Sequence, residues 1–562
     1  MIDGYRSILE RGGGNLLVRS ESNDQVLAKL EQQQLVVLLA KSGQGKSTFV
    51  AQLVSNLLYD IVHVIFIGSV EGSTILFRLL TELVNELLLD LVKFDLHSNV
   101  YPLPNDRSSF PRDEMGIGGL FNALLNKLTD SGKTVLICFD ALNELKSKSA
   151  RSLSFLPNRS KAKILLTTIL DNKKSTSVQE VLFALERRFQ LTTDSSNVVF
   201  LPVLDENEQH AMISTNNSTP LSKEVITSLQ KKEGRTSPLY LRLVSSYLSE
   251  LESVPGDIEG LYDWLLQKLL NVKKKDCNGL DIRQIMCSVA VSGGALFSQQ
   301  LLAMQDKTTT LSSVGTIHFR QLLAHFLRAT PVEDTSLLRI SFIHMQADHC
   351  IRRTFLKEES KRKEAHQFVL SYFIKQYNAG KQNIDELKEG NRQWRSILLG
   401  LPRHLMGSGD RDIAIKYMCN IKYCEQKLSC SLLSELIQDF RQADKKWSCS
   451  PFADFLELLS ANSHVLRAHP SGLVQQALNS RDDSAARLSA LALTHATTNR
   501  CSIRWENRSQ LKPAQVLLIE NQSVLFWCID VSSVSSSGIT YACGGSDACV
   551  HLLDEDGNET VT

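Results

Sequence analysis

The sequence predicts an α/β domain built on a doubly wound parallel sheet, followed by a mostly helical region and a β-rich tail. Short apolar runs alternate with helical patterns from residue 35 to about residue 202. Helical patterns dominate from about 205 to 480, and from 524 onward short β-type runs are separated by Ser-Gly, Gly-Gly and Asp-Gly pairs. Strands that alternate with helices in this way favour a parallel sheet covered by helices on both faces.

Five apolar runs supply the predicted strands of this sheet. Each run is short, rich in branched aliphatic residues and apolar on both faces, which is typical of a parallel strand buried between two helix layers. The runs are LVVLLA at 35–40, VHVIFIG at 62–68, VLICFD at 135–140, KILLTT at 163–168 and VVFL at 198–201.

Helices and one long loop are predicted between these strands. A helix is expected over 73–90, and the segment 95–115, rich in Pro, Asp and Ser, is expected to be an insertion loop. A further strand is expected at 337–345, inside the helical region. The helix after the first strand has an apolar stripe, which consists of Phe49, Val50, Leu53, Val54, Leu57 and Leu58.

A loop with two glycines joins the first predicted strand to this helix. The loop sequence is AKSGQGKS at 40–47. Because Gly43 and Gly45 have no Cβ, backbone amides can approach a phosphate closely there. We therefore expect successive amides from Gln44 to Thr48 to point at a β-phosphate, at the positive end of the following helix.

Two side chains complete the expected phosphate site. Lys46 would reach the β- and γ-oxygens, and the hydroxyl of Ser47 would bind Mg²⁺. Ala40 stands where the first glycine of this motif is usual, a mild departure that should not prevent phosphate binding. The motif follows an apolar strand and opens an amphipathic helix, which distinguishes a phosphate loop from an ordinary glycine turn.

Polar residues at the ends of the next strands are the candidates for catalysis. Asp140 ends an apolar strand and would face Mg²⁺ through water; an N-cap role is the alternative. Glu144 could polarise the attacking water or be a surface carboxylate, and both interpretations stay open. Thr167 and Thr168 could sense a γ-phosphate by hydrogen bonding, or they are ordinary strand residues.

Together the segments 40–47, 140–144 and 163–168 resemble the NACHT class of STAND NTPases, which are signal-transducing ATPases with several domains. The segment VIFIGSVEGSTILFRLLTELVNEL at 64–87 is similar to the second strand and helix of the telomerase-associated and nephrocystin-type NACHT proteins. The resemblance implies ATP or ADP with Mg²⁺ as cofactors. In agreement with adenine, no guanine-reading N-K-x-D motif follows the sensing strand.

The resemblance implies two further nucleotide contacts. In TSPLYLRLV at 236–244, Pro238 corresponds to a proline that packs on the adenine. In ISFIHMQADHCIRR at 340–353, His344 corresponds to the winged-helix histidine that contacts the phosphates in the resting state. A hydrogen-bonded core histidine is the alternative for His344.

One departure from the class bears on the rate of hydrolysis. Many NACHT proteins carry an arginine just after the sensing strand, but this chain has TTILDNKK there. Since a positive charge on the γ-phosphate is worth orders of magnitude in rate, hydrolysis is expected to be slow unless Lys173, Lys174 or a neighbouring subunit substitutes.

The resemblance also implies a division into six segments. A lead-in helix precedes the NACHT P-loop NTPase domain, which is followed by a helical domain, a winged-helix domain, a helical arm domain and the first WD-type blade, with Ser546-Asp547 at the place of a structural Asp. A single blade cannot close a propeller, so the sequence is predicted to be a truncated fragment. The segments are 1–34, 35–204, 205–275, 276–356, 357–515 and 516–562.

Composition argues against several other classes of protein. The formal net charge is +1, from 62 Lys and Arg against 61 Asp and Glu, so no general attraction to nucleic acid or to an anionic membrane is expected. The 12 cysteines include no C-x-x-C pair, which indicates reduced thiols and a cytoplasmic location. No uncharged apolar run approaches the ~18 residues of a membrane span.

Three functions are consistent with these patterns. The first is a nucleotide-operated switch that couples ATP or ADP to domain rearrangement and self-assembly, with WD repeats that bind protein partners. The second is a turnover ATPase such as a motor, for which no arginine finger is evident. The third is a scaffold that binds nucleotide for stability without hydrolysis.

Overall fold

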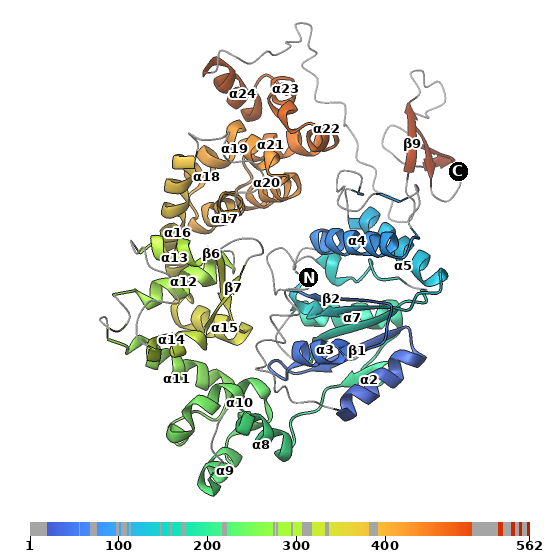
Figure 1. Ribbon diagram of the computed structural model, residues 1–562. Helices are drawn as coiled ribbons and strands as arrows, with labels where there is room; N and C mark the ends of the chain where they lie inside the picture. Colours follow the sequence, from blue (N-terminus) through green and yellow to red (C-terminus); the bar gives the residue numbers. More distant parts are fainter. Residues whose placement is uncertain are drawn as a thin grey trace. The chain divides into compact units, whose positions relative to one another are not determined.

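A computed structural model of the chain shows two compact units, Met1–Gly409 and Asp410–Thr562. Figure 1 shows the helices and strands of both units along the sequence. The structure describes residues 20–55, 57–67, 76–96, 101–102, 110–111, 114–145, 148–157, 160–170, 176–215, 222–273, 276, 279–293, 296–305, 317–331, 337–380, 392–496, 526–531, 541–545, 550–553 and 559–561.

A five-stranded parallel sheet is the centre of the first unit. Its strand order is β2-β3-β4-β1-β5, so β1 lies between β4 and β5 although it comes first in the sequence. The pairing confirms the parallel sheet that the five apolar runs predict. The strands are β1 Leu35–Ala40, β2 Ile61–Phe66, β3 Val135–Asp140, β4 Lys163–Ile169 and β5 Val198–Phe200.

Helices cover both faces of this sheet (Figure 1). Alternate side chains of β1 enter two separate apolar clusters, as the period of two along a strand requires. One cluster contains α4 Leu76–Lys93 and α5 Glu114–Asp130, and the other contains α2 Ser20–Gln32 and α3 Lys46–Ser55. All six residues of β1 are buried, so the backbone that leaves its carboxyl end is firmly fixed.

Two predicted boundaries in this domain are wrong. Helix α3 ends at Ser55, and Leu58 is fully exposed at 100% instead of continuing the buried apolar stripe. Helix α5 begins at Glu114, inside the segment 95–115 that was expected to be loop. The helical pattern from 114 onward contains buried apolar residues at helical spacing, so the Pro-rich composition applies only to the residues before it.

The rest of the first unit is mostly helical. Its second sheet has three antiparallel strands in the order β6-β8-β7. These strands are β6 Leu296–Phe297, β7 Leu327–Pro331 and β8 Leu338–Phe342. The helices are α6 Lys148–Arg151, α7 Thr176–Phe189, α8 Glu206–Thr215, α9 Lys223–Gln230, α10 Pro238–Val244, α11 Ile258–Leu270, α12 Ile282–Ser292, α13 Ser298–Ala303, α14 Ile317–Ala324, α15 Met345–Phe355, α16 Glu359–Gly380 and α17 Arg392–Ser408, with the 3-10 helices η2 Leu142–Glu144, η3 Glu233–Thr236 and η4 Ser245–Glu250.

The strand predicted over 337–345 is shorter than expected. Strand β8 ends at Phe342 because His344 is already the N-cap of α15. The sheet formed by β6, β8 and β7 lies within the segment 276–356, for which a winged-helix domain was expected. That domain type stays a prediction.

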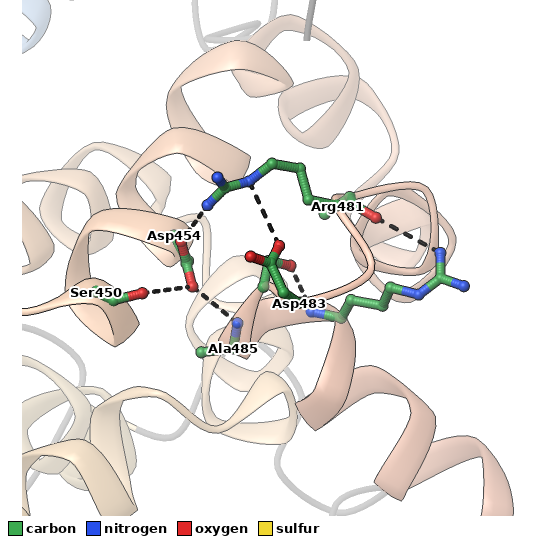
Figure 2. A network of polar contacts seen from close by, with 8 residues as sticks. Ser450, Asp454, Arg481, Asp483 and Ala485 are labelled. Carbon is green, nitrogen blue, oxygen red and sulfur yellow. Dashed lines mark hydrogen bonds and ion pairs between the residues drawn. The ribbon is translucent and has the colours of Figure 1, made fainter. Parts of the chain in front are cut away.

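The second unit begins with short helices that are joined by a polar network. Asp454 of α21 is buried, and its carboxylate accepts hydrogen bonds from the Ser450 hydroxyl, Arg481 Nη2 and the Ala485 amide at 3.2, 3.0 and 2.8 Å (Figure 2). Ala485 is the first residue of α24, so a carboxylate of one helix satisfies an unpaired amide at the positive end of another. The helices are α18 Arg411–Met418, α19 Ile421–Ser429, α20 Leu433–Trp447, α21 Ser450–Ala461, α22 Ser463–Ala468, η7 Pro470–Gly472, α23 Leu473–Leu478 and α24 Ala485–Ala496.

The tail forms a four-stranded antiparallel sheet. Its strand order is β12-β11-β10-β9, which is a meander. Ser546 and Asp547 lie outside the described residues, and the WD-type propeller stays a prediction. The strands are β9 Phe526–Val531, β10 Tyr541–Gly545, β11 Val550–Leu553 and β12 Glu559–Val561.

Candidate functional site

The loop between β1 and α3 has the backbone that a phosphate site needs. Gly43 has φ +81° and Gly45 has φ +82°, and both values lie in the left-handed region that L side chains rarely adopt. Helix α3 begins at Lys46, directly after this turn. We call residues 40–47 the P-loop. Its amides precede a helix N-terminus, where an anion is favoured by both the free N–H groups and the helix dipole.

Lys46 is held over the P-loop by backbone carbonyls. Its Nζ donates to the carbonyl oxygens of Ala40 and Lys41 at 2.9 and 3.1 Å. Burial lowers the pKa of Lys46 to about 8, and the nearby carboxyl of Asp140 opposes that shift. A buried ammonium without a full counter-charge favours an incoming anion, as the phosphate role requires.

The structure brings Ser47 and Asp140 together, as the sequence predicts for a Mg²⁺ site. The Ser47 hydroxyl donates to Asp140 Oδ2 at 2.5 Å, and the Thr167 hydroxyl donates to Asp140 Oδ1 at 2.5 Å. Burial raises the pKa of Asp140, while the hydrogen bonds from Ser47 and Thr167, the charge of Lys46 and the amide of Ala141 lower it. One carboxylate and one hydroxyl suit Mg²⁺, which keeps most of its ligands as water and phosphate oxygen.

The residue after Asp140 has a strained backbone. Ala141 has φ 62° and ψ 51°, a left-handed conformation that a residue with a Cβ adopts at a cost of about 1–2 kcal/mol. Its amide donates to Thr167 Oγ1 at 2.9 Å. Thr167 therefore connects Asp140 and Ala141 to β4. It makes hydrogen bonds at the site, which an ordinary strand residue would not make.

Glu144 lies at the end of η2, four residues after Asp140. Asn143 Nδ2 donates to Glu144 Oε1 at 3.2 Å. Burial raises the pKa of Glu144, the positive potential of His349 lowers it, and the carboxyls of Asp140 and Asp348 raise it. Glu144 is thus within electrostatic reach of Asp140 and of α15. No sequence pattern indicated His349 or Asp348 of α15 as part of the site.

Helix α10 begins against the P-loop. The Ser237 hydroxyl and the Leu239 amide both donate to the carbonyl oxygen of Gly43, at 3.2 and 3.3 Å. A Cβ placed on Gly45 would lie 3.6 Å from Cγ of Pro238. The structure therefore places Pro238, the expected adenine contact, directly beside the second glycine of the P-loop. Neither Ser237 nor Leu239 was a sequence candidate.

His344 is brought to the same site from α15. It is the N-cap of that helix, and its Nδ1 accepts a hydrogen bond from the Gln346 amide at 3.1 Å. Burial lowers the pKa of His344 to about 4, with smaller contributions from Lys46 and His349. The ring is thus neutral at pH 7 with its proton on Nε2. This N–H could donate a hydrogen bond to a phosphate oxygen.

The described residues fit a nucleotide at the P-loop. Among them, Ser42 Oγ and Gln44 Oε1 are buried without a hydrogen-bond partner, and buried polar atoms normally have one. Thr48 lies in the first turn of α3, where helical amides are free. A polyphosphate would be held by the amides of this loop and by Lys46, while Ser47 and Asp140 would hold Mg²⁺.

Some sequence expectations fall outside the site as described. Lys173 and Lys174, the proposed substitutes for an arginine, lie outside the described residues. In the described part of the chain, no cluster of three His, Cys, Asp or Glu side chains could hold a metal ion. There, too, none of the helices combines the length and the apolar character that crossing a bilayer requires. None of the seven cysteines Cys138, Cys287, Cys350, Cys419, Cys424, Cys430 and Cys449 forms a disulfide.

The parallel sheet and the P-loop at its carboxyl edge define a P-loop NTPase fold. The pattern of the APAF-1 helical domain matches residues 363–496, from α16 to the end of α24. Over 578 aligned residues the chain is 22% identical to telomerase protein component 1 of Rattus norvegicus and 21% identical to that of Mus musculus. Each alignment covers 92% of this chain and 20% of the relative, so the chain spans about a fifth of the length of these relatives.

A solved structure was also found to be similar. A Walker-type ATPase of Pyrococcus abyssi aligns with a TM-score of 0.32 and 14% sequence identity, covering 60% of this chain and 96% of that one. The helical-domain match concerns residues 363–496, whereas the similarity to telomerase protein component 1 extends over almost the whole chain.

Proposed function

We propose that the chain is a nucleotide-operated switch of the STAND class that binds ATP or ADP with Mg²⁺ at the P-loop. The observation that carries the proposal is the meeting of four segments at the P-loop. The P-loop supplies the ammonium, β3 supplies Asp140, and α10 and α15 bring Ser237 and His344 to the same place. Residues separated by some 300 positions converge on one anion-binding loop.

In the closed state, ADP would be held between the P-loop and these later segments. Pro238 would contact the adenine, and His344 would donate from Nε2 to a phosphate. A γ-phosphate would add negative charge beside Asp140 and Glu144, which favours a rearrangement of α10 and α15. To move such an equilibrium from about 1:99 to 99:1, the two nucleotides must bind the two states with affinities that differ by about 5.5 kcal/mol.

The rearranged protein would expose a surface for self-association, and the β-rich tail would bind protein partners in a cytoplasmic setting. The rat and mouse relatives are named as telomerase components. For this chain we propose protein partners only, since its net charge of +1 gives no general affinity for nucleic acid.

A nucleotide-stabilised scaffold is the second candidate. The residues after β4 include no arginine up to residue 186. This absence predicts slow hydrolysis. Slow hydrolysis with nucleotide-dependent assembly supports the switch, tight binding with neither supports the scaffold, and rapid multiple turnover supports a motor.

The test of nucleotide binding is Lys46→Ala. Loss of the ammonium should lower the affinity for ADP and Mg²⁺ by about 10- to 100-fold, because hydrogen bonds to charged groups are worth about 1.5–3 kcal/mol. Isothermal titration calorimetry measures this change. Lys41→Ala is the matched control, because Lys41 is an exposed lysine of the same loop that should leave the affinity unchanged. Equal affinity of parent and Lys46→Ala would refute the site.

A further inference from the structure

Ser237 occupies the N-cap position of α10 without capping it. Its backbone is extended, with φ −100° and ψ 122°, as an N-cap residue requires. An N-cap serine usually accepts a hydrogen bond from an amide of its own helix, but none is present at α10. The hydroxyl instead donates to the carbonyl oxygen of Gly43 at 3.2 Å, and Ser237 is only 5% exposed.

A second donor from the same helix reaches the same oxygen. The amide of Leu239 donates to Gly43 O at 3.3 Å. Leu239 is the second residue of α10, so its amide is one of the four that a helix leaves unpaired at its start. We call these two hydrogen bonds the α10 contact. The hydrogen bond from Ser237 joins residues 194 positions apart in the sequence.

The segment that carries the α10 contact is itself fixed on both sides. The Gly234 amide donates to Gly256 O at 2.6 Å, and the hydroxyl of the fully buried Tyr240 donates to Pro255 O at 2.6 Å. The start of α10 is therefore a fixed support for the glycine loop.

Peptide planarity carries the consequence to the nucleotide. The carbonyl of Gly43 and the N–H of Gln44 belong to one planar trans peptide, so they point in opposite directions. When α10 holds the carbonyl, the amide is turned away from α10. The Gln44 amide has only a long 3.4 Å hydrogen bond to Lys41 O, so it is available to a phosphate oxygen.

We propose that Ser237 is a positioning residue that orients the Gln44 amide for a nucleoside polyphosphate and couples α10 to the occupied P-loop. The inference rests on the proposed function and adds that α10 is the element that responds to bound nucleotide. Bound phosphate and the α10 contact strengthen each other, because both favour one orientation of the same peptide. Release of α10 therefore accelerates release of the nucleotide.

The experiment measures the dissociation of ribose-labelled fluorescent ADP, with Mg²⁺, from the full chain after a chase with unlabelled ADP. Ser237→Ala should release the probe about 3- to 10-fold faster, the range expected for one net neutral hydrogen bond. Ser237→Thr keeps the hydroxyl and should release it within about twofold of the parent.

Ser245→Ala is the matched control. Ser245 is a buried serine directly after α10, and its hydroxyl donates to Arg242 O within the same segment at 2.7 Å. It should release ADP like the parent. Parent-like release by Ser237→Ala, equal acceleration in Ser245→Ala, or failure of Ser237→Thr to restore slow release would each overturn the inference.

Hydrogen exchange of the nucleotide-free chain separates this inference from the proposed function. Ser237→Ala should exchange faster over residues 237–241, because the Leu239 amide loses a held acceptor. If the parent binds no ADP, the proposed function fails while exchange still tests the α10 contact. Parent-like exchange in Ser237→Ala would show that the hydroxyl does not hold the loop.

Discussion

Asp140 is a buried carboxyl that two hydroxyls hold in place. Burial disfavours its charge, while the hydrogen bonds from Ser47 and Thr167 favour it, and burial is the larger effect because the pKa is raised. A carboxyl whose pKa is higher in the folded state than in the unfolded state destabilises the fold once it is ionised, that is, as the pH rises above its unfolded value. The chain retains this arrangement at the place where Mg²⁺ is expected.

Replacing Asp140 should therefore abolish Mg²⁺-dependent ADP binding without lowering the stability of the fold. Asp140→Asn removes a desolvated charge, so the free energy of unfolding of the nucleotide-free protein at pH 7 should stay level or rise by about 1 kcal/mol. The gain in ADP affinity on adding Mg²⁺ should disappear. Urea unfolding and calorimetry with and without Mg²⁺ measure the two effects.

Glu144→Gln is the comparison for this variant. It should keep the Mg²⁺-dependent gain in affinity, because Glu144 lies beyond the metal candidate and would act on water. If both variants bind ADP and Mg²⁺ like the parent, the metal site lies elsewhere.

The sequence reveals site residues when the pattern that marks them is local, within a few residues of the chain. Lys46 and Ser47 follow from the loop pattern, and Asp140 follows from its place at the end of an apolar strand. Ser237 could not be found in this way, because a serine before a proline also predicts an ordinary helix start. Its partner is 194 residues away, and only the folded chain shows which carbonyl it meets.

At the scale of elements, the position of α10 depends on one glycine. A Cβ on Gly234 would lie 2.5 Å from Cδ2 of Tyr240, whose ring is buried and whose hydroxyl is bonded to Pro255. The ring has no free space to move into, so a side chain at position 234 must displace α10 itself.

Gly234→Ala should lower the free energy of unfolding by about 1–3 kcal/mol through overpacking, and it should accelerate ADP release because α10 moves from the P-loop. Gly119→Ala is the control, since a Cβ there meets no atom within 4 Å and helix α5 gains propensity. Thermal unfolding measures the change in stability, and the ADP chase measures the rate of ADP release. A Gly234→Ala protein as stable as the parent would contradict the packing argument.

The strands were predictable because they are buried on both faces and short. Three boundaries were not. Ser55 ends α3 without a glycine or proline to mark it, and β8 ends early because His344 caps α15 with a ring nitrogen, a role that residue type alone does not indicate. The helix beginning at Glu114 follows a Pro-rich stretch whose composition hid its start.

At the scale of the whole molecule, several partly or fully buried histidines make the fold sensitive to acid. Burial lowers the pKa of His325 to about 4, with a smaller effect of Arg242, and lowers the pKa of His404 well below its ordinary value. The unfolded chain binds these protons near pH 6.5 while the folded chain does not. Stability is therefore full above about pH 6.5 and is lost as the pH falls towards 4.

His325→Phe should flatten this dependence. Between pH 6.5 and 5 the free energy of unfolding of the parent should fall more steeply than that of the variant, by up to about 1 kcal/mol per pH unit. Urea unfolding at several pH values measures the slopes. Tyr247→Phe is the control, because the neighbouring Tyr247 ring, 5.5 Å away, has a pKa raised to about 12 and does not titrate there. Equal slopes for parent and His325→Phe would contradict the assignment.

The place of β1 in the sheet has a consequence for synthesis on the ribosome. In this sheet β1 is translated first, but it lies between β4 and β5, which are translated last. Its carbonyls and amides pair with residues near 164 and 198. The glycine loop thus leaves the ribosome long before β4, β5 and α10, the elements that fix its conformation. Contacts of such long range form slowly. A nascent chain should capture labelled ADP only after α10 has emerged, and earlier chains would need a chaperone to cover their apolar strands.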